Sequence, residues 1–403
     1  MSRDVLLAEA EALYDQVVAW RRTLHQHPEV GFHEHETARF IREQLTALGG
    51  LEVSRPTETS VLAVLRTGRP GLVLALRADI DALPIHEEND VAYRSLHDGV
   101  MHACGHDGHT ALLLGVATVL VRHRARLAGE VRFIFQHAEE VSPGGAEALV
   151  ERGVMDGVEA VLGVHLWASL PVGRLALLPG PAMAAPDTFE ITIEGQGGHA
   201  AIPQDTVDPV AIGALVVTGL QHIAARMVDP LEPVVVSVTQ FHAGTASNVI
   251  PNRAVLGGTV RTFDAALRAR VPQLIDRLVQ GTCAAHGARG VVRHTPGYRP
   301  VVNDPALTAR LAGVVREVLG EGVLAAMRPS MGGEDFSAYQ QRAPGVFAFV
   351  GAGNAALGAD HPHHHPRFQV DEASLAQGMA YLLAATHALL ADAPAAAAAH
   401  GAP

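Results

Sequence analysis

Continuous apolar runs of strand length alternate with helical segments in the first half of this 403-residue chain. Uninterrupted apolar strands are typical of a parallel sheet that is buried on both faces, because helices cover each face. We therefore predict an α/β fold in which a mostly parallel sheet is sandwiched by helices. The runs lie at residues 61–65, 72–79, 131–136 and 158–165.

The pattern changes at about residue 185, where strands and helices follow the order βαββαβ up to residue 297. This order is typical of a compact, ferredoxin-like module. Because the α/β pattern resumes afterwards, we predict an inserted domain at 185–297 and a catalytic domain built from 1–184 and 298–392. The Ala-rich end, 393–403, is predicted to be a disordered tail.

Composition excludes several classes of partner. The formal net charge is −12 and Lys and Arg form no run, so we expect no nucleic-acid partner. Two cysteines in so long a chain are no disulfide framework. The N-terminal segment is charged throughout, and no apolar run approaches the roughly 18 residues of a membrane span. We therefore predict a cytoplasmic protein with no membrane partner.

One short stretch, MHACGHDGHT at 101–110, carries chemistry-bearing residues at high density. Its Cys104 has three interpretations: a metal ligand, a catalytic nucleophile or a small buried residue. Downstream, Glu139 and Glu140 end another apolar strand. One such carboxylate can bind a metal while its neighbour takes a proton from metal-bound water. An exposed acidic pair is the alternative.

Two further histidine positions complete the pattern. His165 ends an apolar strand, and four histidines lie in the Pro-bounded loop at 361–366. Each of these could be a structural or surface residue by itself. Because binding groups gather where parallel strands end, we interpret the Cys, His and Glu residues together as a two-metal hydrolytic centre.

Across nearly its whole length the sequence resembles the M20 metallopeptidases, specifically the amidohydrolase branch of hippurate hydrolases, auxin-conjugate hydrolases and N-acyl amino acid amidohydrolases. The motifs that carry the resemblance occur in the family's order. They are RRTLHQHPEVGFHEHET (21–37), RADIDALPI (77–85), MHACGHDGHTA (101–111), AEE (138–140), GGHAAIP (197–203), SNVIP (247–251), GTVRTF (258–263) and GGEDFSAY (332–339).

The resemblance implies a role for each matching residue. Glu139 would be the general base and acid, with Asp79 and Asp107 orienting the site from behind the ligands. In the inserted module His199 would stabilise the oxyanion, while Asn248 and Arg261 would hold the substrate carboxylate or its amide. The implied metal ligands are Cys104 (bridging), His106, Glu140, His165 and His364.

Two departures from the family pattern affect this assignment. His137 stands where proline is usual, and His363 stands where leucine commonly precedes the C-terminal ligand. The sequence therefore does not fix which histidine of 363–365 is the metal ligand, and the assignment can shift by one position. We choose His364 because relatives place the ligand two residues before the proline, here Pro366.

The resemblance further implies a Zn-peptidase-like catalytic domain, a lid that closes over the substrate and two divalent ions (Zn, Mn, Co or Ni). The expected reaction is hydrolysis of the amide bond of N-acyl amino acids, small-molecule conjugates such as hippurate. A homodimer through the inserted module is expected, or a homotetramer. The alternatives are a dipeptidase or carboxypeptidase, an N-acetyl-diaminopimelate deacetylase, a thiol hydrolase that uses Cys104, and a non-catalytic metal-binding protein.

Overall fold

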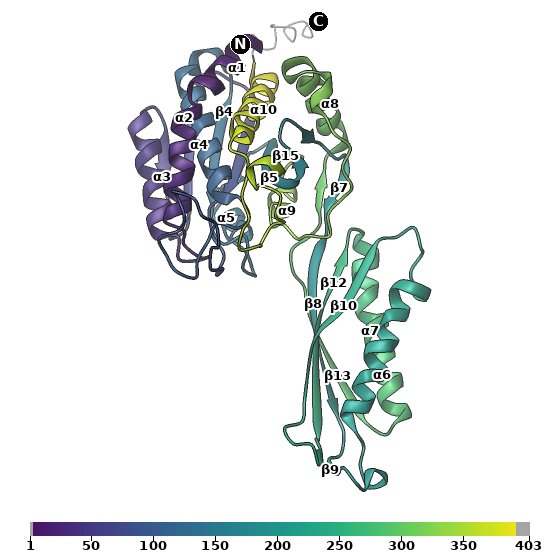
Figure 1. The fold of residues 1–403 in the computed structure, drawn as a ribbon. Helices are drawn as coiled ribbons and strands as arrows, with labels where there is room; N and C mark the ends of the chain where they lie inside the picture. The colour runs from purple at the N-terminus through teal and green to yellow at the C-terminus, as the bar shows by residue number, and fades with distance from the viewer. Residues whose placement is uncertain (1–2, 392–403) are drawn as a thin grey trace, which may run out of the picture. The chain divides into compact units, whose positions relative to one another are not determined.

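The computed structural model describes residues 3–391, which divide into two compact units (Figure 1). Of the described residues, the larger unit comprises 3–182, 302–328 and 335–391, and the smaller one 183–301 and 329–334. Residues 298–301 and the short segment Pro329–Glu334 thus group with the smaller unit, whereas the sequence analysis expected all of 298–392 in the catalytic domain. The predicted tail, 393–403, lies outside the described residues.

A seven-stranded sheet forms the centre of the larger unit. The four strands β4, β3, β5 and β15 are parallel, and antiparallel strands flank them on both sides. The predicted α/β fold with a mostly parallel sheet is confirmed. In spatial order the strands are β1 (Glu52–Ser54), β2 (Val61–Arg66), β4 (Glu130–Gln136), β3 (Val73–Asp79), β5 (Ala160–Pro171), β15 (Gly345–Gly353) and β6 (Leu175–Ala176).

Both faces of this sheet are covered by other parts of the larger unit. Successive side chains of a strand point to opposite faces, so buried neighbours in one strand show packing on both sides. Along β5, Leu162 and Val164 enter the main hydrophobic core, while Gly163 leaves room for the ring of Phe336 on the other face. The core contains helix α4 (His106–Arg122), whose residues are buried from His106 to Leu120.

The other helices of the larger unit surround this core. Helices α2, α3 and α10 contact α4, and α8 contacts α10. The bounds are α1 (Arg3–Ala12), α2 (Tyr14–Gln26), α3 (His35–Leu48), α5 (Ala146–Glu151), α8 (Pro305–Leu319), α9 (Ser337–Gln340) and α10 (Ala373–Leu390).

The smaller unit is the predicted βαββαβ module. Its four strands form an antiparallel sheet in the order β10, β12, β8, β13, and a two-stranded ribbon of β9 and β11 lies near one end. The elements are β8 (Ala185–Glu194), β9 (Gly198–His199), α6 (Pro209–His222), β10 (Val234–Ala243), β11 (Val249–Ile250), β12 (Arg253–Thr262), α7 (Ala265–Ala285) and β13 (Arg289–Thr295).

Two described helices reach the length and hydropathy of a membrane span, which the sequence analysis did not expect. Of the α10 window, 67% is buried, as in the core helix of a globular unit. The window at Pro209–Met227, which contains α6, is only 28% buried. Helix α6 packs one side on its own sheet and leaves Val210 and Leu215 exposed on the other.

Candidate two-metal centre

The predicted site residues of the larger unit follow the carboxyl ends of its parallel strands. Asp79 ends β3, Glu139 and Glu140 follow β4, and His165 lies in the second half of β5. Parallel strands bring these ends to one edge of the sheet, where ligands of α/β proteins bind. Cys104 joins them from the segment that leads into α4, which begins after Gly105 in a left-handed conformation (φ 98°).

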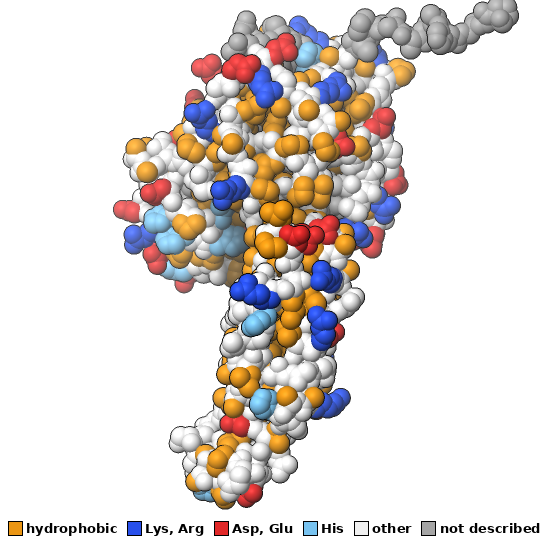
Figure 2. Space-filling view, turned by 90° about the vertical axis from the view of Figure 1, so that its right-hand side faces the viewer, with side chains coloured by type: hydrophobic (Ala, Val, Ile, Leu, Met, Phe, Trp, Pro, Cys, Tyr) orange, Lys and Arg blue, Asp and Glu red, His pale blue; other side chains and the backbone are white. Residues whose placement is uncertain are grey.

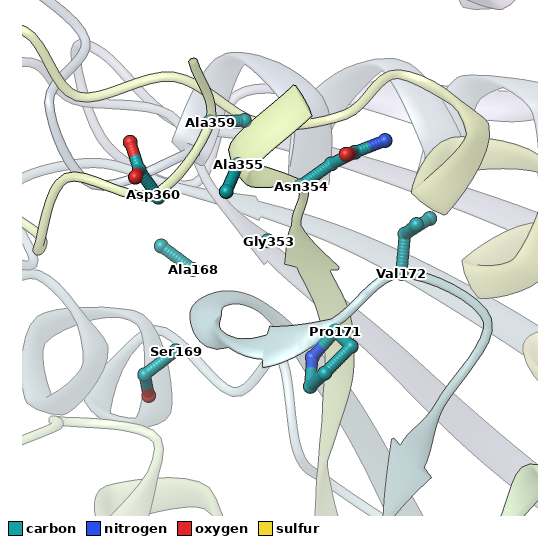
Figure 3. A pocket seen from close by; sticks show the side chains of 9 residues that line it. All are labelled: Ala168, Ser169, Pro171, Val172, Gly353, Asn354, Ala355, Ala359 and Asp360. Carbon is teal, nitrogen blue, oxygen red and sulfur yellow. The ribbon is translucent and has the colours of Figure 1, made fainter. Parts of the chain in front are cut away.

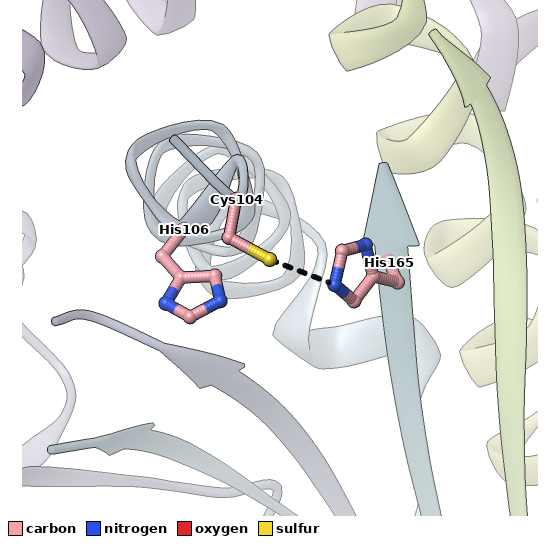
Figure 4. Close-up of side chains that lie close together, drawn as sticks. All are labelled: Cys104, His106 and His165. Carbon is pink, nitrogen blue, oxygen red and sulfur yellow. Dashed lines mark hydrogen bonds between the residues drawn. The ribbon is translucent and has the colours of Figure 1, made fainter. Parts of the chain in front are cut away.

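Cys104, His106 and His165 form a first group of candidate ligands (Figure 4). Their ligand atoms all lie within 4.8 Å of one another, and Cys104 Sγ is 3.5 Å from His165 Nε2. The other ring nitrogen of His165 donates to the carbonyl of Leu166 at 2.8 Å. This bond directs the lone pair of Nε2 toward the thiol.

A second group shares Cys104 with the first. Its members are Cys104, Glu140 and His364, and Glu140 Oε1 lies 3.2 Å from His364 Nε2. Glu139 and Glu140 also group with His106. The five predicted ligands therefore form two overlapping sets with the thiol in common, as a pair of bridged ions requires.

The donor atoms fit divalent cations. His106 Nε2 and Glu140 Oε1 are buried without a hydrogen-bond partner, which is costly for polar atoms. His106 Nδ1 donates to the carbonyl of Asp81 at 2.9 Å, so the unpartnered Nε2 faces the cluster. One thiol, three imidazoles and one carboxylate are a mixed S/N/O set that suits Zn and similar ions.

The electrostatics of the cluster also favour a bound cation. Burial raises the pKa of the Cys104 thiol well above its usual value, and the carboxylates of Glu140 and Glu139 raise it further. For His106, burial is outweighed by Asp79, Asp81 and Glu140, which raise its pKa to about 10. Cations at this place would offset the negative charge and stabilise the thiolate. The thiol by itself is no activated nucleophile, which argues against a thiol hydrolase.

Asp79 is held from two directions. Its Oδ1 accepts from His109 Nδ1 at 2.6 Å, and its Oδ2 accepts from Arg77 at 2.7 Å. His109 Nε2 in turn accepts from the backbone N–H of Leu166, next to His165. His109 therefore ties β3 to β5 beside the cluster. The sequence analysis did not single out His109, because its partner Asp79 lies 30 residues away in the chain.

Asp107 does not contact a candidate metal ligand, as an orienting group would. Its Oδ2 accepts from Arg21 Nε at 2.7 Å and from His25 Nδ1 at 2.8 Å, rather than from a candidate ligand. Burial is outweighed by Arg21 and His25, which hold the pKa of Asp107 far below its usual value. Asp107 thus joins the start of α4 to α2. Arg21 and His25 have the i, i+4 spacing of one helix face. This spacing is the feature of the sequence from which their shared contact could have been inferred.

In the histidine loop, the structure separates two neighbours. His363 Nε2 donates to the carbonyl of Leu166 at 3.0 Å, and its ring packs against Trp167. His364 turns toward Glu140, and its backbone N–H donates to the carbonyl of Ala103 at 2.8 Å. His364 is therefore the member of 363–365 that reaches the cluster.

Non-glycine residues in the left-handed backbone conformation also lie in or near the candidate metal cluster. Among the described residues it occurs at Phe32 (φ 66°), Ala138 (φ 50°) and His364 (φ 66°). His364 is a candidate ligand, and Ala138 directly precedes Glu139. Such conformations cost energy and persist where surrounding contacts hold them, which is common at functional sites.

A hollow of about 530 Å³ lies farther along β5 than His165 (Figure 3). Small side chains dominate its lining, and Asp360 is its one charged residue. The lining residues are Ala168, Ser169, Pro171, Val172, Gly353, Asn354, Ala355, Ala359 and Asp360.

The predicted residues of the smaller unit do not lie together. His199 and Asn248 meet at the β9–β11 ribbon, where the N–H of Ala200 donates to the carbonyl of Asn248. Arg261 lies near the other end of β12, paired with Pro186. Its Nε donates to Thr259 Oγ1 at 3.1 Å, and burial lowers the pKa of its guanidinium.

Comparison with known proteins agrees with the geometry. Residues 75–388 match Peptidase family M20/M25/M40. The chain is 55% identical over 303 residues to an N-acyl-L-amino acid amidohydrolase of Geobacillus stearothermophilus, which covers 75% of this chain and 82% of that protein. It is 39% identical over 387 residues to thermostable carboxypeptidase 2 of Saccharolobus solfataricus, with 95% and 96% covered.

Among solved structures, the YXEP protein of Bacillus subtilis is described as a dinuclear metal binding peptidase of the M20 family. Its TM-score is 0.81 at 37% identity, with 93% of this chain and 98% of that chain covered. The chain belongs to Peptidase family M20/M25/M40. It is a hydrolase with a site for two divalent metal ions.

Proposed function

We propose that this enzyme hydrolyses the amide bond of N-acyl amino acids and releases a carboxylic acid and a free amino acid. One observation carries the proposal: Glu139 adjoins a cluster in which Cys104 belongs to two overlapping sets of candidate ligands. That arrangement provides a general base beside a place for two cations. The similarity to an N-acyl-L-amino acid amidohydrolase supports this substrate class.

In the proposed reaction Cys104, His106, Glu140, His165 and His364 hold the ions. Two divalent ions bound there would supply an activated water and polarise the scissile carbonyl. Glu139 accepts the proton of the attacking water and returns it to the leaving nitrogen. Asp79 keeps its orientation through Arg77 and His109, so that the histidines next to it stay fixed.

We assign the amino-acid end of the substrate to the smaller unit. Arg261 binds the substrate carboxylate, because its planar guanidinium can bind both oxygens. Asn248 binds the amide, and His199 stabilises the oxyanion.

A second copy of the chain supplies His199 and Asn248 in this proposal. Arg261 and Arg253 are eight residues apart on β12, which corresponds to ~26 Å at the rise of a strand. The ribbon of β9 and β11 lies beyond the Arg253 end of β12. The N–H groups of Gly195 and Gly197, which lead into β9, both donate hydrogen bonds to Asn252, the residue before β12. His199 and Arg261 of one chain thus cannot meet at one small substrate.

The surface for this homodimer is the exposed side of α6 and the adjoining edge strand β10. Val210, Leu215 and Phe241 are 40%, 48% and 40% exposed there, which is high for such apolar side chains. Figure 2 shows one side of the smaller unit, where hydrophobic side chains lie among basic ones. An unpaired edge strand can extend its sheet into that of a second copy.

The ion and the compartment are proposals as well. A mixed sulfur, nitrogen and oxygen site suits Zn, Mn, Co or Ni, and availability decides among them. We propose a cytoplasmic location, because both cysteines, Cys104 and Cys283, are free thiols.

The test is a panel of N-acetyl, N-benzoyl and indole-acetyl amino acids, assayed with enzyme that has been reconstituted separately with each ion. Simple dipeptides, carboxypeptidase substrates and N-acetyl-diaminopimelate are assayed in parallel. We expect the highest kcat/KM on an N-acyl amino acid. Turnover of the dipeptides alone, or of nothing in the panel, would overturn the proposal.

A further inference from the structure

The turn that carries Glu139 and Glu140 has an unusual backbone. It begins directly after β4, and Ala138 within it adopts the left-handed conformation (φ 50°). A Cβ atom makes this conformation unfavourable. Ala138 is fully buried, so its N–H needs a partner inside the protein. Contacts from elsewhere in the chain must therefore stabilise the turn.

The partner of that N–H is a buried carboxylate from a distant segment. Glu34 is fully buried, and its Oε1 accepts from the N–H of Ala138 at 2.7 Å. Two residues farther along the turn, the N–H of Glu140 donates to Asp81 Oδ2 at 3.0 Å. Two carboxylates thus hold the backbone on either side of Glu139.

The segment around Glu34 is shaped to reach this turn. Gly31 lies so close that a Cβ atom there would be 3.2 Å from Ala138 Cα, so a side chain would push the two segments apart. Phe32, itself left-handed (φ 66°), places its ring 5.5 Å from that of His137. Glu34 reaches the turn through its short bond to the N–H of Ala138, and the side chain of Thr59 also hydrogen-bonds Glu34.

We propose that Glu34 is a positioning residue, which holds Ala138 in its left-handed conformation and thereby directs Glu139 and Glu140 into the metal cluster. Without this acceptor, Ala138 returns to an ordinary conformation, and the two side chains that follow turn away. The inference rests on the proposed function only in the role of Glu139 as the base.

The side chain at position 34 needs an acceptor oxygen at the right reach rather than a charge. Burial raises the pKa of Glu34 to about 7, with a smaller contribution from Asp81. Glu34→Gln should therefore keep kcat within about threefold, because the amide oxygen replaces Oε1. Glu34→Met has a similar length but no acceptor oxygen. We expect it to lower kcat about 100-fold, with KM little changed, as for other misplaced catalytic groups.

A second substitution separates positioning from general loss of stability. Gly adopts the left-handed conformation without the penalty of a Cβ atom. The double variant Glu34→Met/Ala138→Gly should therefore regain at least about tenfold in kcat over Glu34→Met. The matched control is Glu36→Met, two residues farther along in the first turn of α3, where the side chain is 64% exposed and paired with Arg39. It should behave as the wild type.

Hydrogen exchange of ion-free protein gives a readout without turnover. The amide of Ala138 should exchange faster in Glu34→Met but stay protected in Glu34→Gln and Glu36→Met. Glu34→Asp, which keeps the charge but is too short to reach, decides the matter if Glu34→Met does not fold. Wild-type kcat and protection in Glu34→Asp would overturn the proposal. If the wild type hydrolyses no N-acyl amino acid, the proposed function fails, and exchange alone decides the role of Glu34.

Discussion

Cys104 contributes a buried thiol to both sets of candidate ligands, and three carboxylates, those of Glu140, Glu139 and Asp79, raise the pKa of this thiol. In such surroundings a thiolate is stable only with cations beside it. Ionisation of this side chain is therefore coupled to ion binding. Substitutions at Cys104 and at Glu139 should therefore differ: one should lose bound metal together with activity, and the other should lose activity alone.

Cys104→Ser should lose metal along with activity, because a neutral hydroxyl is a poorer bridging ligand than a thiolate. We expect fewer than two bound ions per chain after dialysis, measured by elemental analysis. Cys283→Ser, at the other buried thiol, is the control and should keep both ions. A Cys104→Ser protein that is inactive but retains both ions would contradict the bridging role.

Glu139→Gln should have the opposite profile. The amide cannot take the proton of water, so kcat should fall by several orders of magnitude while both ions remain bound. The same elemental analysis, together with kcat, checks this. Unchanged activity would favour a metal-binding protein over an enzyme.

At the scale of elements, the start of α4 is joined to α2 by a buried ion pair. Arg21 and Asp107 are each 1% exposed, and Nε and Oδ2 are 2.7 Å apart. Removal of Arg21 leaves Asp107 buried with His25 as its remaining side-chain partner, and loss of one member of a buried ion pair is strongly destabilising. The pair therefore links the N-terminal helices to the segment that carries Cys104 and His106.

Arg21→Met should lower the free energy of unfolding of the larger unit by about 3–5 kcal/mol. Its neighbour Arg22, 48% exposed and paired with Glu372, is the matched control. Arg22→Met should cost at most about 1 kcal/mol, as surface pairs do. Urea unfolding followed by circular dichroism measures both. Equal effects of the two variants would show that the buried pair has no special role.

Elements and local motifs were predictable from the sequence, whereas contacts between distant residues were not. The apolar runs predicted the parallel strands, and HACGH with AEE predicted the ligand segments, because those signals are local. Arg21 and Asp107 are 86 residues apart, and Glu34 and Ala138 are 104 apart. Glu34 was also hidden because it contacts a backbone N–H, which any residue type provides.

At the scale of the whole molecule, ions should stabilise the folded state as well as support turnover. They bind the native cluster and not the unfolded chain, so ions at 100 times their Kd add about 2.7 kcal/mol per site. Chelation should therefore lower Tm and abolish activity, and added Zn or Mn should restore both. A Tm that does not respond to ions would contradict the cluster. Glu139→Gln should show the same Tm shift without activity.

The proposed dimer makes a prediction that no single chain can satisfy. Glu139→Gln and His199→Ala are each expected to be nearly inactive. If each site combines Glu139 of one chain with His199 of the other, unfolding and refolding an equal mixture regains about a quarter of wild-type activity, because half of the dimers are mixed and have one intact site. No recovery in refolded mixtures would place both residues in the same chain.

The length of β12 between Arg253 and Arg261 has a consequence for the cell. If one strand keeps His199 and Arg261 too far apart for one substrate, a solitary chain is folded and metal-loaded but idle. Specific activity then depends on how often two chains meet, and it falls on dilution below the dissociation constant of the pair. The rate of hydrolysis in the cell would thus rise more than proportionally with the concentration of the chain.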